Sequence, residues 1–317
     1  MSKVAFLFPG QGSQAPGMGR DLAQNFPVAR EVFRQADDAL GFSLSALCFE
    51  GPEEELRLTA NSQPAILAAS LAAFEVLREK GFQADFVAGH SLGEYSALVA
   101  AGSLTLSDAL LLVRRRGQYM QEAVPEGEGS MAALLGLDRA QVEAVCAEAA
   151  QGQVVSPANF NSSTQTVIAG HAAAVDRALN LAREQGVRRA VLLKVSAPFH
   201  CALMKPAEEK LAPDLLATDF RPLQVPLVNN VDARLLRNPE EAREGLRRQV
   251  TAPVEWAGAM QQLIKAGVTQ FVEVGPGKVL TGLLRQIDRA VKCHSTQNSG
   301  EVGEMVRNLG APSGTPA

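Results

Sequence analysis

Short apolar runs alternate along the chain with longer stretches in which apolar residues recur every three or four positions. Val4–Phe8, Phe86–Ala88 and Gln270–Val274 are short runs of this kind, typical of buried strands. Asn61–Lys80 is one of the longer stretches and predicts a buried helix, with Pro64 in its first turn. This alternation predicts an α/β fold.

The pattern changes after Val124–Gly129, a polar, Gly-rich segment that predicts a domain boundary. The next elements are expected in the order strand, helix, strand, strand, helix, strand: Met131–Leu137, Arg139–Ala150, Val154–Phe160, Thr166–Ala169, Ala172–Gln185 and Arg189–Val195. This is the ferredoxin-like order. We therefore predict that residues 127–196 form a small inserted domain and that residues 1–126 and 197–317 form the larger one. The residues after Leu309 are predicted to be a disordered tail.

Composition narrows the class of protein. The 317 residues are 46% hydrophobic and 20% charged, with a formal net charge of −4 and no long block of like charges, so nucleic acid is not an expected partner. No apolar stretch approaches the length of a membrane span, and Val4–Phe8 is too short for a signal peptide. The four cysteines are widely spaced, without C-x-x-C, so we expect no metal and a reduced, cytoplasmic protein.

The segment Gly89-His90-Ser91-Leu92-Gly93 fits G-x-S-x-G between a predicted strand and a predicted helix at Glu94–Ala101. Strand, sharp turn and helix is the setting of a nucleophile elbow, in which the serine hydroxyl stands clear of the sheet. The helix N-terminus behind it favours developing negative charge. The alternative is a Gly-rich turn that happens to contain a serine.

Arg116 lies within the apolar stripe of a predicted helix at Leu106–Ala123, whereas Arg114 points to the opposite side. A guanidinium on a core-facing stripe cannot lose its charge, so it needs an anionic partner. That partner is either an internal Asp or Glu or the carboxylate of a substrate, held by two hydrogen bonds.

His200 is the best candidate for a general base among four histidines, because it lies on a loop that opens a helix. His90 adjoins Ser91 but is expected to point the other way off the strand. The alternative for His200 is a loop histidine without a role.

Two Gly-rich loops do not fit nucleotide binding. Gly10-x-Gly12-x-x-Ala15 is followed by Pro16-Gly17 and by a single predicted helix, Asp21–Leu40, with no second strand ending in an acid. Its glycines instead allow backbone N–H groups to approach a ligand oxygen, or the loop is a plain strand-exit turn. Gly275-Pro276-Gly277-Lys278 lacks the first Gly and the Ser or Thr of a Walker loop.

Five stretches, taken together, resemble the malonyl-CoA:acyl-carrier-protein transacylase family: Phe8–Gln14, Gly89–Ser96, Arg116-Gly117 with Met120–Ala123, Ser196–Met204 and Val272–Gly277. They occur in the family's order and span nearly the whole chain. The resemblance implies an α/β-hydrolase-like core with a parallel sheet, carrying a ferredoxin-like insert. It also implies a ping-pong transfer of malonyl from malonyl-CoA to acyl carrier protein.

The resemblance also implies roles for single residues. Ser91 would be the acylated nucleophile and His200 its general base, oriented by the carbonyl of Gln249. The N–H groups of Gln11 and Leu92 would form the oxyanion hole. Arg116 would bind the malonyl carboxylate, and the further substrate-binding residues would be Met120, Asn159 and Asn161. No cofactor or metal is implied.

The bulky Phe199 beside the base would favour malonyl over methylmalonyl. Two other functions remain open on the motifs alone. One is a serine hydrolase or thioesterase, which would turn over without a carrier protein. The other is a carrier-protein docking module whose site is inactive.

Overall fold

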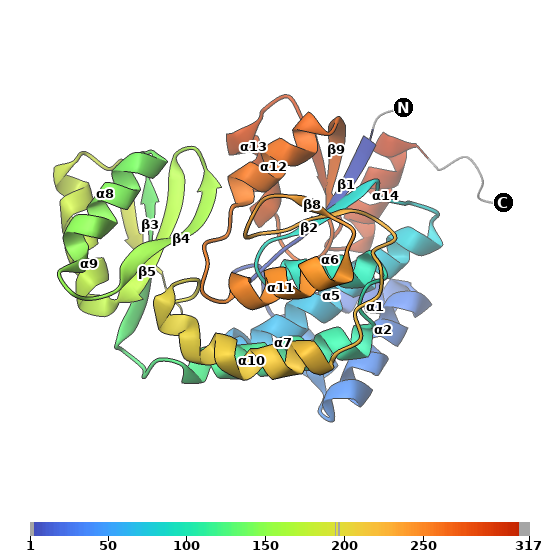
Figure 1. Cartoon of the computed structure of the whole chain (residues 1–317). Coiled ribbons are helices and arrows are strands. Elements are labelled where there is room, and N and C mark those ends of the chain that lie inside the picture. Colours follow the sequence, from blue (N-terminus) through green and yellow to red (C-terminus); the bar gives the residue numbers. More distant parts are fainter. Residues whose placement is uncertain (1–2, 194, 196, 311–317) are drawn as a thin grey trace.

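Two β-sheets organise the chain, of which the computed structural model describes residues 3–193, 195 and 197–310 (Figure 1). The larger sheet has the order β10-β9-β1-β2-β7-β8. All neighbouring strands are parallel except the antiparallel pair β7 and β8. Its strands are β1 (Lys3–Phe8), β2 (Phe86–Gly89), β7 (Leu227–Val228), β8 (Leu235–Leu236), β9 (Val268–Glu273) and β10 (Lys292–Ser295). The predicted α/β fold with a parallel sheet is confirmed.

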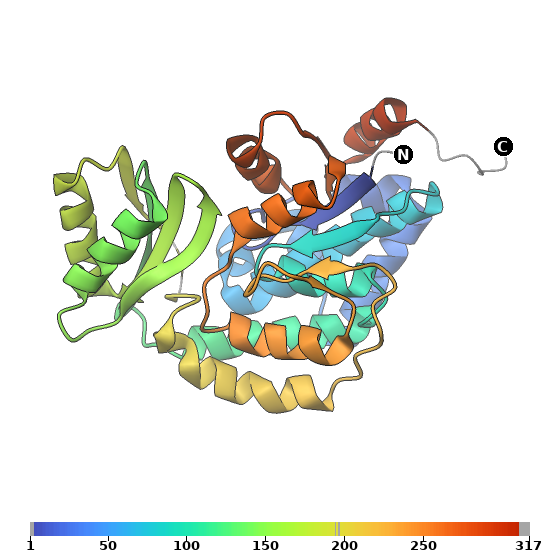
Figure 2. The same ribbon diagram turned by 45° about the horizontal axis from the view of Figure 1, so that its top comes forward.

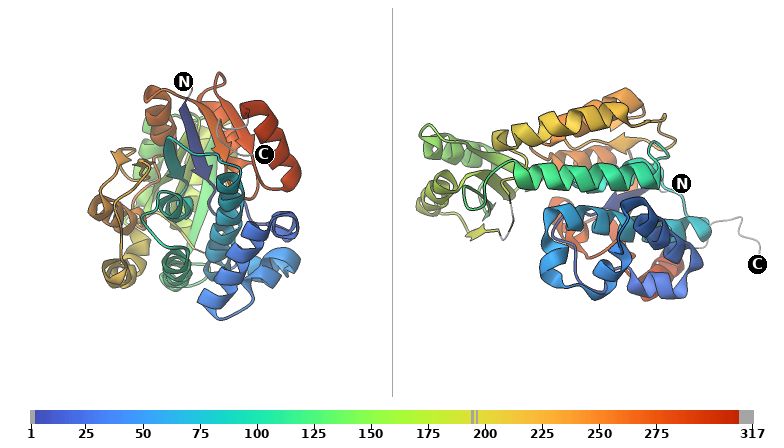
Figure 3. Two further views of the ribbon diagram at one scale, coloured as in Figure 1. Left: turned by 90° about the vertical axis from the view of Figure 1, so that its right-hand side faces the viewer. Right: turned by 90° about the horizontal axis from the view of Figure 1, so that it is seen from below.

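Both faces of the larger sheet are covered by helices (Figures 1 and 2). Alternate residues of β1 enter different cores: Phe6 and Phe8 pack with most of the helices, whereas Ala5 and Leu7 pack with α12 and α13. Seen from below, α7 and α10 run side by side (Figure 3). The helices that precede β3 or follow β6 in the chain are α1 (Arg20–Asn25), α2 (Pro27–Leu40), α3 (Leu44–Glu50), α4 (Glu53–Arg57), α5 (Thr59–Glu79), α6 (Gly93–Ala100), α7 (Leu106–Glu122), the short 3-10 helix η1 (Ala202–Met204), α10 (Lys205–Ala217), α11 (Pro239–Gln249), α12 (Trp256–Lys265), α13 (Val279–Ile287) and α14 (Ser299–Leu309).

The smaller sheet is antiparallel, with the order β4-β5-β3-β6. In chain order its elements are β3 (Gly129–Leu135), α8 (Arg139–Ala150), β4 (Val155–Ser162), β5 (Gln165–His171), α9 (Ala172–Glu184) and β6 (Arg189–Leu192). An Asp138–Gln141 capping box begins α8. The order of elements is the one that the sequence predicts. Asn159 of β4 forms an isolated bridge with Val254, in the segment that precedes α12.

Two helices that contain a proline differ from their predictions. The predicted helix Asp21–Leu40 is broken in two, and α2 begins at Pro27, which cannot donate the N–H of a continuous helix. Helix α5 begins at Thr59, so Pro64 lies inside it rather than in its first turn. The Ala60 carbonyl, which Pro64 cannot bond, accepts a hydrogen bond from Arg114 at 2.6 Å.

The predicted tail after Leu309 lies outside the described part of the chain except for Gly310, which follows α14. Ser196 of the fourth motif also lies outside the described part. Among the described residues, no helix is both long enough and apolar enough to span a membrane.

Candidate active site

Ser91 occupies the turn between β2 and α6 with φ 51°, in the left-handed region that non-glycine residues rarely adopt. The flanking glycines make this turn feasible. A Cβ at Gly89 would lie 1.9 Å from the carbonyl carbon of Gly93, and one at Gly93 would lie 2.0 Å from the oxygen of Phe8. The turn is also fixed by Asn230, which accepts a 2.6 Å hydrogen bond from the N–H of Ser91 and donates one of 2.7 Å to Gly89 O.

His200 meets Ser91 although 109 positions separate them: its Nε2 lies 2.8 Å from Ser91 Oγ. Its Nδ1 lies 2.8 Å from the main-chain oxygen of Gln249. Because a carbonyl oxygen only accepts, Nδ1 carries the proton and the bare Nε2 accepts the Ser91 hydroxyl. Burial, aided by the nearby charge of Arg116, lowers the pKa of His200 to about 3, so the imidazole is neutral near pH 7.

Arg116 is almost fully buried on α7, as its place in the apolar stripe predicts. One guanidinium nitrogen donates to Ser91 Oγ at 3.0 Å and to Gln249 Oε1 at 2.9 Å. The other terminal nitrogen donates to Gln63 Oε1 at 2.7 Å. All three partners are neutral, and no Asp or Glu of the described residues forms an ion pair with Arg116. The guanidinium therefore reaches the candidate nucleophile without a carboxylate of its own.

Met120 and Gln249 contact the residues that position Ser91 and Arg116. The amide of Gln63 contacts the Met120 sulfur at 3.8 Å, so Met120 packs against a partner of Arg116. The side chain of Gln249 contacts Arg116 through its oxygen, while its amide nitrogen donates to Ser91 O at 3.1 Å and to Glu94 Oε2 at 2.7 Å.

A cleft of about 410 Å³ opens over Ser91 and His200. Gln11 and Asn159 also line it, whereas Leu92, Arg116, Met120, Asn161 and Gln249 do not. The side chain of Gln11 is held by Ser62 at 3.1 Å and Thr59 at 3.3 Å. Within the described residues, neither the Gln11 N–H nor the Leu92 N–H donates to another group, so both remain available to a ligand oxygen.

His90 also lines the cleft. Its Nε2 lies 2.9 Å from the side-chain oxygen of Asn161, and its ring lies 5.3 Å from that of Trp256. Asn161, on β4 of the smaller sheet, thus contacts His90 at the end of β2 in the larger sheet. Burial lowers the pKa of His90.

Sequence reasoning missed three buried polar residues of the site: Gln63, Glu94 and Asn230. Two of them carried a signal. Gln63 is a polar residue in a helix that is apolar all round, and Asn230 follows an apolar strand at its carboxyl end. Such residues need buried hydrogen-bond partners, which the sequence does not name.

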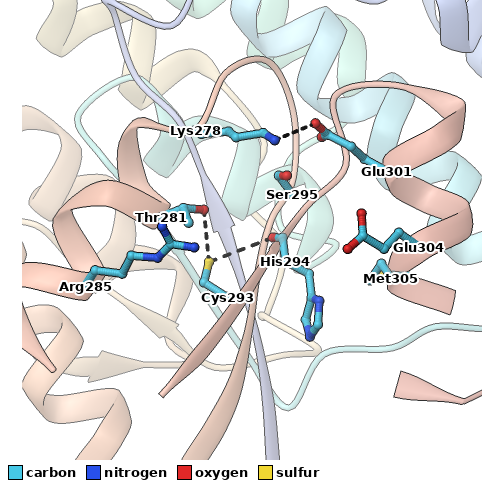
Figure 4. A pocket seen from close by; sticks show the side chains of 9 residues that line it. All are labelled: Lys278, Thr281, Arg285, Cys293, His294, Ser295, Glu301, Glu304 and Met305. Carbon is cyan, nitrogen blue, oxygen red and sulfur yellow. Dashed lines mark hydrogen bonds and ion pairs between the residues drawn. The ribbon is translucent and has the colours of Figure 1, made fainter. Parts of the chain in front are cut away.

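A second cavity of about 180 Å³ lies between α13, β10 and α14, and none of the predicted site residues lines it (Figure 4). The lysine that lines this cavity, Lys278, already forms an ion pair with Glu301 at 2.9 Å. The nearby start of α13 is occupied too: the carboxylate of Glu273 accepts from the N–H groups of Leu280 and Thr281. The Gly275–Lys278 loop therefore offers no vacant helix N-terminus to a phosphate.

Comparison with known proteins shows the family to which the chain belongs. The sequence model of the acyl transferase domain matches residues 5–316. The chain is 52% identical over 288 residues to the malonyl CoA-acyl carrier protein transacylase of Escherichia coli (strain K12), covering 90% of this chain and 93% of that protein. It is 50% identical over 310 residues to the protein of the same name from Bacillus subtilis (strain 168), covering 98% of both.

Solved structures agree. The malonyl CoA-acyl carrier protein transacylase from Coxiella burnetii superposes with a TM-score of 0.95 at 43% identity, covering 97% of this chain and 98% of that one. A malonyl-transacylase in complex with a type II PKS acyl-carrier protein superposes with a TM-score of 0.95 at 48% identity, covering 97% of this chain and 100% of that one.

Proposed function

The chain belongs to the acyl transferase domain family, and we propose that it transfers malonyl groups from coenzyme A to the phosphopantetheine thiol of acyl carrier protein. One observation carries the proposal. The Ser91 hydroxyl lies 2.8 Å from the bare nitrogen of a neutral imidazole and 3.0 Å from a buried guanidinium that has no carboxylate partner among the described residues.

In the first half-reaction, His200 Nε2 takes the Ser91 proton while Oγ attacks the thioester carbonyl. The N–H groups of Gln11 and Leu92 stabilise the resulting oxyanion, and such donors typically contribute about 2.7–4 kcal/mol each. The carbon–sulfur bond then breaks, and the protonated His200 returns its proton to the departing coenzyme A thiol. The product is a malonyl ester of Ser91.

Arg116 selects the acyl group in this mechanism. Its guanidinium, positioned by Gln63 and Gln249, binds the free carboxylate of malonyl through charge-assisted hydrogen bonds. An acetyl group offers no such partner and leaves the buried cation unpaired. A buried cation beside the nucleophile favours an acyl group that carries a carboxylate and disfavours a general serine hydrolase.

The second half-reaction repeats the chemistry with a different nucleophile. His200 removes the proton of the carrier-protein thiol, the sulfur attacks the Ser91 ester, and Ser91 leaves with that proton. Within the cleft, the apolar side chains of Met131, Leu193 and Phe199 line the walls and disfavour water, which would otherwise hydrolyse the ester.

We further propose that residues 127–196 form a separate small domain that supplies one wall of this cleft. Its sheet lies wholly within that range, and Met131, Asn159 and Leu193 come from it. A cytoplasmic location is proposed from the four cysteines, which are all free.

Coenzyme A release with and without carrier protein tests the function against the hydrolase alternative. Without carrier protein, a transferase releases one equivalent of coenzyme A per chain and then stops, because the malonyl ester is removed only by the acceptor thiol. Sustained release without acceptor would show a hydrolase.

A further inference from the structure

The charge of Arg116 has no direct compensation within the described residues. A guanidinium does not lose its proton in a protein, and burying it without a counter-charge is costly. Its hydrogen-bond partners, the side chains of Gln63, Ser91 and Gln249, are neutral. The compensating charge must therefore lie beyond these partners.

Glu94 contacts one of these partners, Gln249, from the side away from Arg116. It lies in the first turn of α6 and is fully buried. Its Oε2 accepts hydrogen bonds from the side-chain amide of Gln249 at 2.7 Å and from the N–H of Asn230 at 3.2 Å. The oxygen of the same Gln249 amide accepts from Arg116 at 2.9 Å. One amide thus joins carboxylate and guanidinium, with its N–H toward the anion and its oxygen toward the cation.

Only this orientation of the amide satisfies both neighbours, because the reverse would direct an oxygen at a carboxylate and an N–H at a guanidinium. The two charges also influence each other. Burial raises the pKa of Glu94 to about 7, and the charge of Arg116 opposes that rise. Above that pH Glu94 is ionised and supplies a negative charge behind the site.

We propose that Glu94 is the buried counter-charge of Arg116, and that the Gln249 amide keeps the two apart so that Arg116 stays free for the carboxylate of an acyl group. A carboxylate in direct contact would occupy the guanidinium. The inference rests on the proposed malonyl transfer. It gives the Gln249 side chain a role in specificity, distinct from its main-chain oxygen, which orients His200.

Gln249→Glu tests the spacer, because it puts a carboxylate oxygen on Arg116 at almost unchanged size and leaves the main chain intact. The second oxygen of the new carboxyl group then faces Glu94, and the two carboxyl groups share one proton, which leaves a single negative charge in contact with the guanidinium. We expect acylation by malonyl-CoA to fall at least about 100-fold. The rate of Ser91 labelling by an uncharged fluorophosphonate probe should fall far less than the rate of malonyl acylation, because the probe does not need a free guanidinium. Unchanged malonyl acylation, or an equal loss of both reactions, would overturn the proposal.

Glu94→Gln tests the counter-charge, because its side-chain oxygen can accept the same two hydrogen bonds without the charge. Above the pKa of Glu94, we expect the KM for malonyl-CoA to fall about fivefold, since removing a nearby negative charge strengthens anion binding at an effective dielectric of about 20. The probe rate should change less than the KM, because the probe carries no charge. An unchanged KM would contradict the proposal, and this variant alone decides if Gln249→Glu does not fold.

Glu143→Gln, which removes an exposed carboxylate from α8, controls for the loss of charge and should leave the KM unaltered. A failure of the proposed function would look different, because the parent chain itself would then not take up malonyl.

Discussion

The Nε2 of His200 lies 2.8 Å from the Oγ of Ser91, and each of these residues has a positive φ, 60° and 51°. Both backbones are therefore held in a region that non-glycine residues rarely occupy. The neighbouring structure fixes them there: Asn230 holds the turn of Ser91, and Gln249 O holds the imidazole of His200. The dyad is thus positioned before substrate arrives.

The acylation rate should be insensitive to pH on the acid side of neutrality. Because the pKa of His200 is lowered to about 3, the base stays unprotonated as the pH falls from about 8 to about 5. Rapid-quench measurement of acylation at saturating malonyl-CoA checks this. Because burial raises the pKa of Glu94 to about 7, the profile is also measured in Glu94→Gln. A loss of rate centred near the ordinary histidine pKa of 6.5 in both chains would show that the imidazole is not held neutral.

The same pKa shift predicts an acid sensitivity of the fold. Between pH 6.5 and about 3 the unfolded His200 binds a proton that the folded one does not. Its contribution to stability is therefore complete above pH 6.5 and is lost as the pH falls through this window. In His200→Gln, the free energy of unfolding should decline less steeply between these pH values than in the parent chain. Urea unfolding of both chains over a series of pH values measures the two slopes, and equal slopes would refute the shift.

Arg116→Ala should reverse the preference for an anionic acyl group. We expect kcat/KM for malonyl-CoA to fall about 100-fold or more, as for the loss of two charge-assisted hydrogen bonds, whereas that for acetyl-CoA should fall far less. Arg115→Ala is the matched control, because Arg115 is a half-exposed neighbour on α7 that pairs with Asp214. If selectivity survives in Arg116→Ala, another group recognises the malonyl carboxylate.

Phe199 is predicted to exclude a branched acyl group. It lines the cleft next to His200 and is itself buried. Replacing it with Ala should raise kcat/KM for methylmalonyl-CoA relative to malonyl-CoA by about tenfold, since one methyl group in an apolar pocket is worth about 1–3 kcal/mol. The ratio measured in one competition assay is internally controlled for any loss of folded enzyme. A ratio equal to that of the parent chain would show that the α-methyl group does not meet this side chain.

The features that sequence predicted best are local ones. The glycines around Ser91 specify a turn within five residues, and the periodicity of α7 places Arg116 inside the core from its own helix. Thr105 begins that helix by accepting a hydrogen bond from the N–H of Asp108, as a capping residue should.

Contacts between segments far apart in the chain could not be predicted from the sequence. Asn230 holds the turn of Ser91 from 139 positions away, and Glu94 meets Gln249 across 155. No local pattern pairs such residues. The start of α5 was missed for the same reason, because the carbonyl that Pro64 leaves unbonded is satisfied by Arg114, 54 positions along the chain from Ala60.

The central claim is that Ser91 carries the malonyl group between the two thiols. Intact-mass spectrometry of the parent chain and of Ser91→Ala, after malonyl-CoA and again after carrier protein, tests it most directly. We expect one malonyl adduct on the parent chain, its disappearance when the acceptor is added, and no adduct on Ser91→Ala. A Ser91→Ala chain that still becomes malonylated, or a parent adduct that the carrier protein does not remove, would contradict the account.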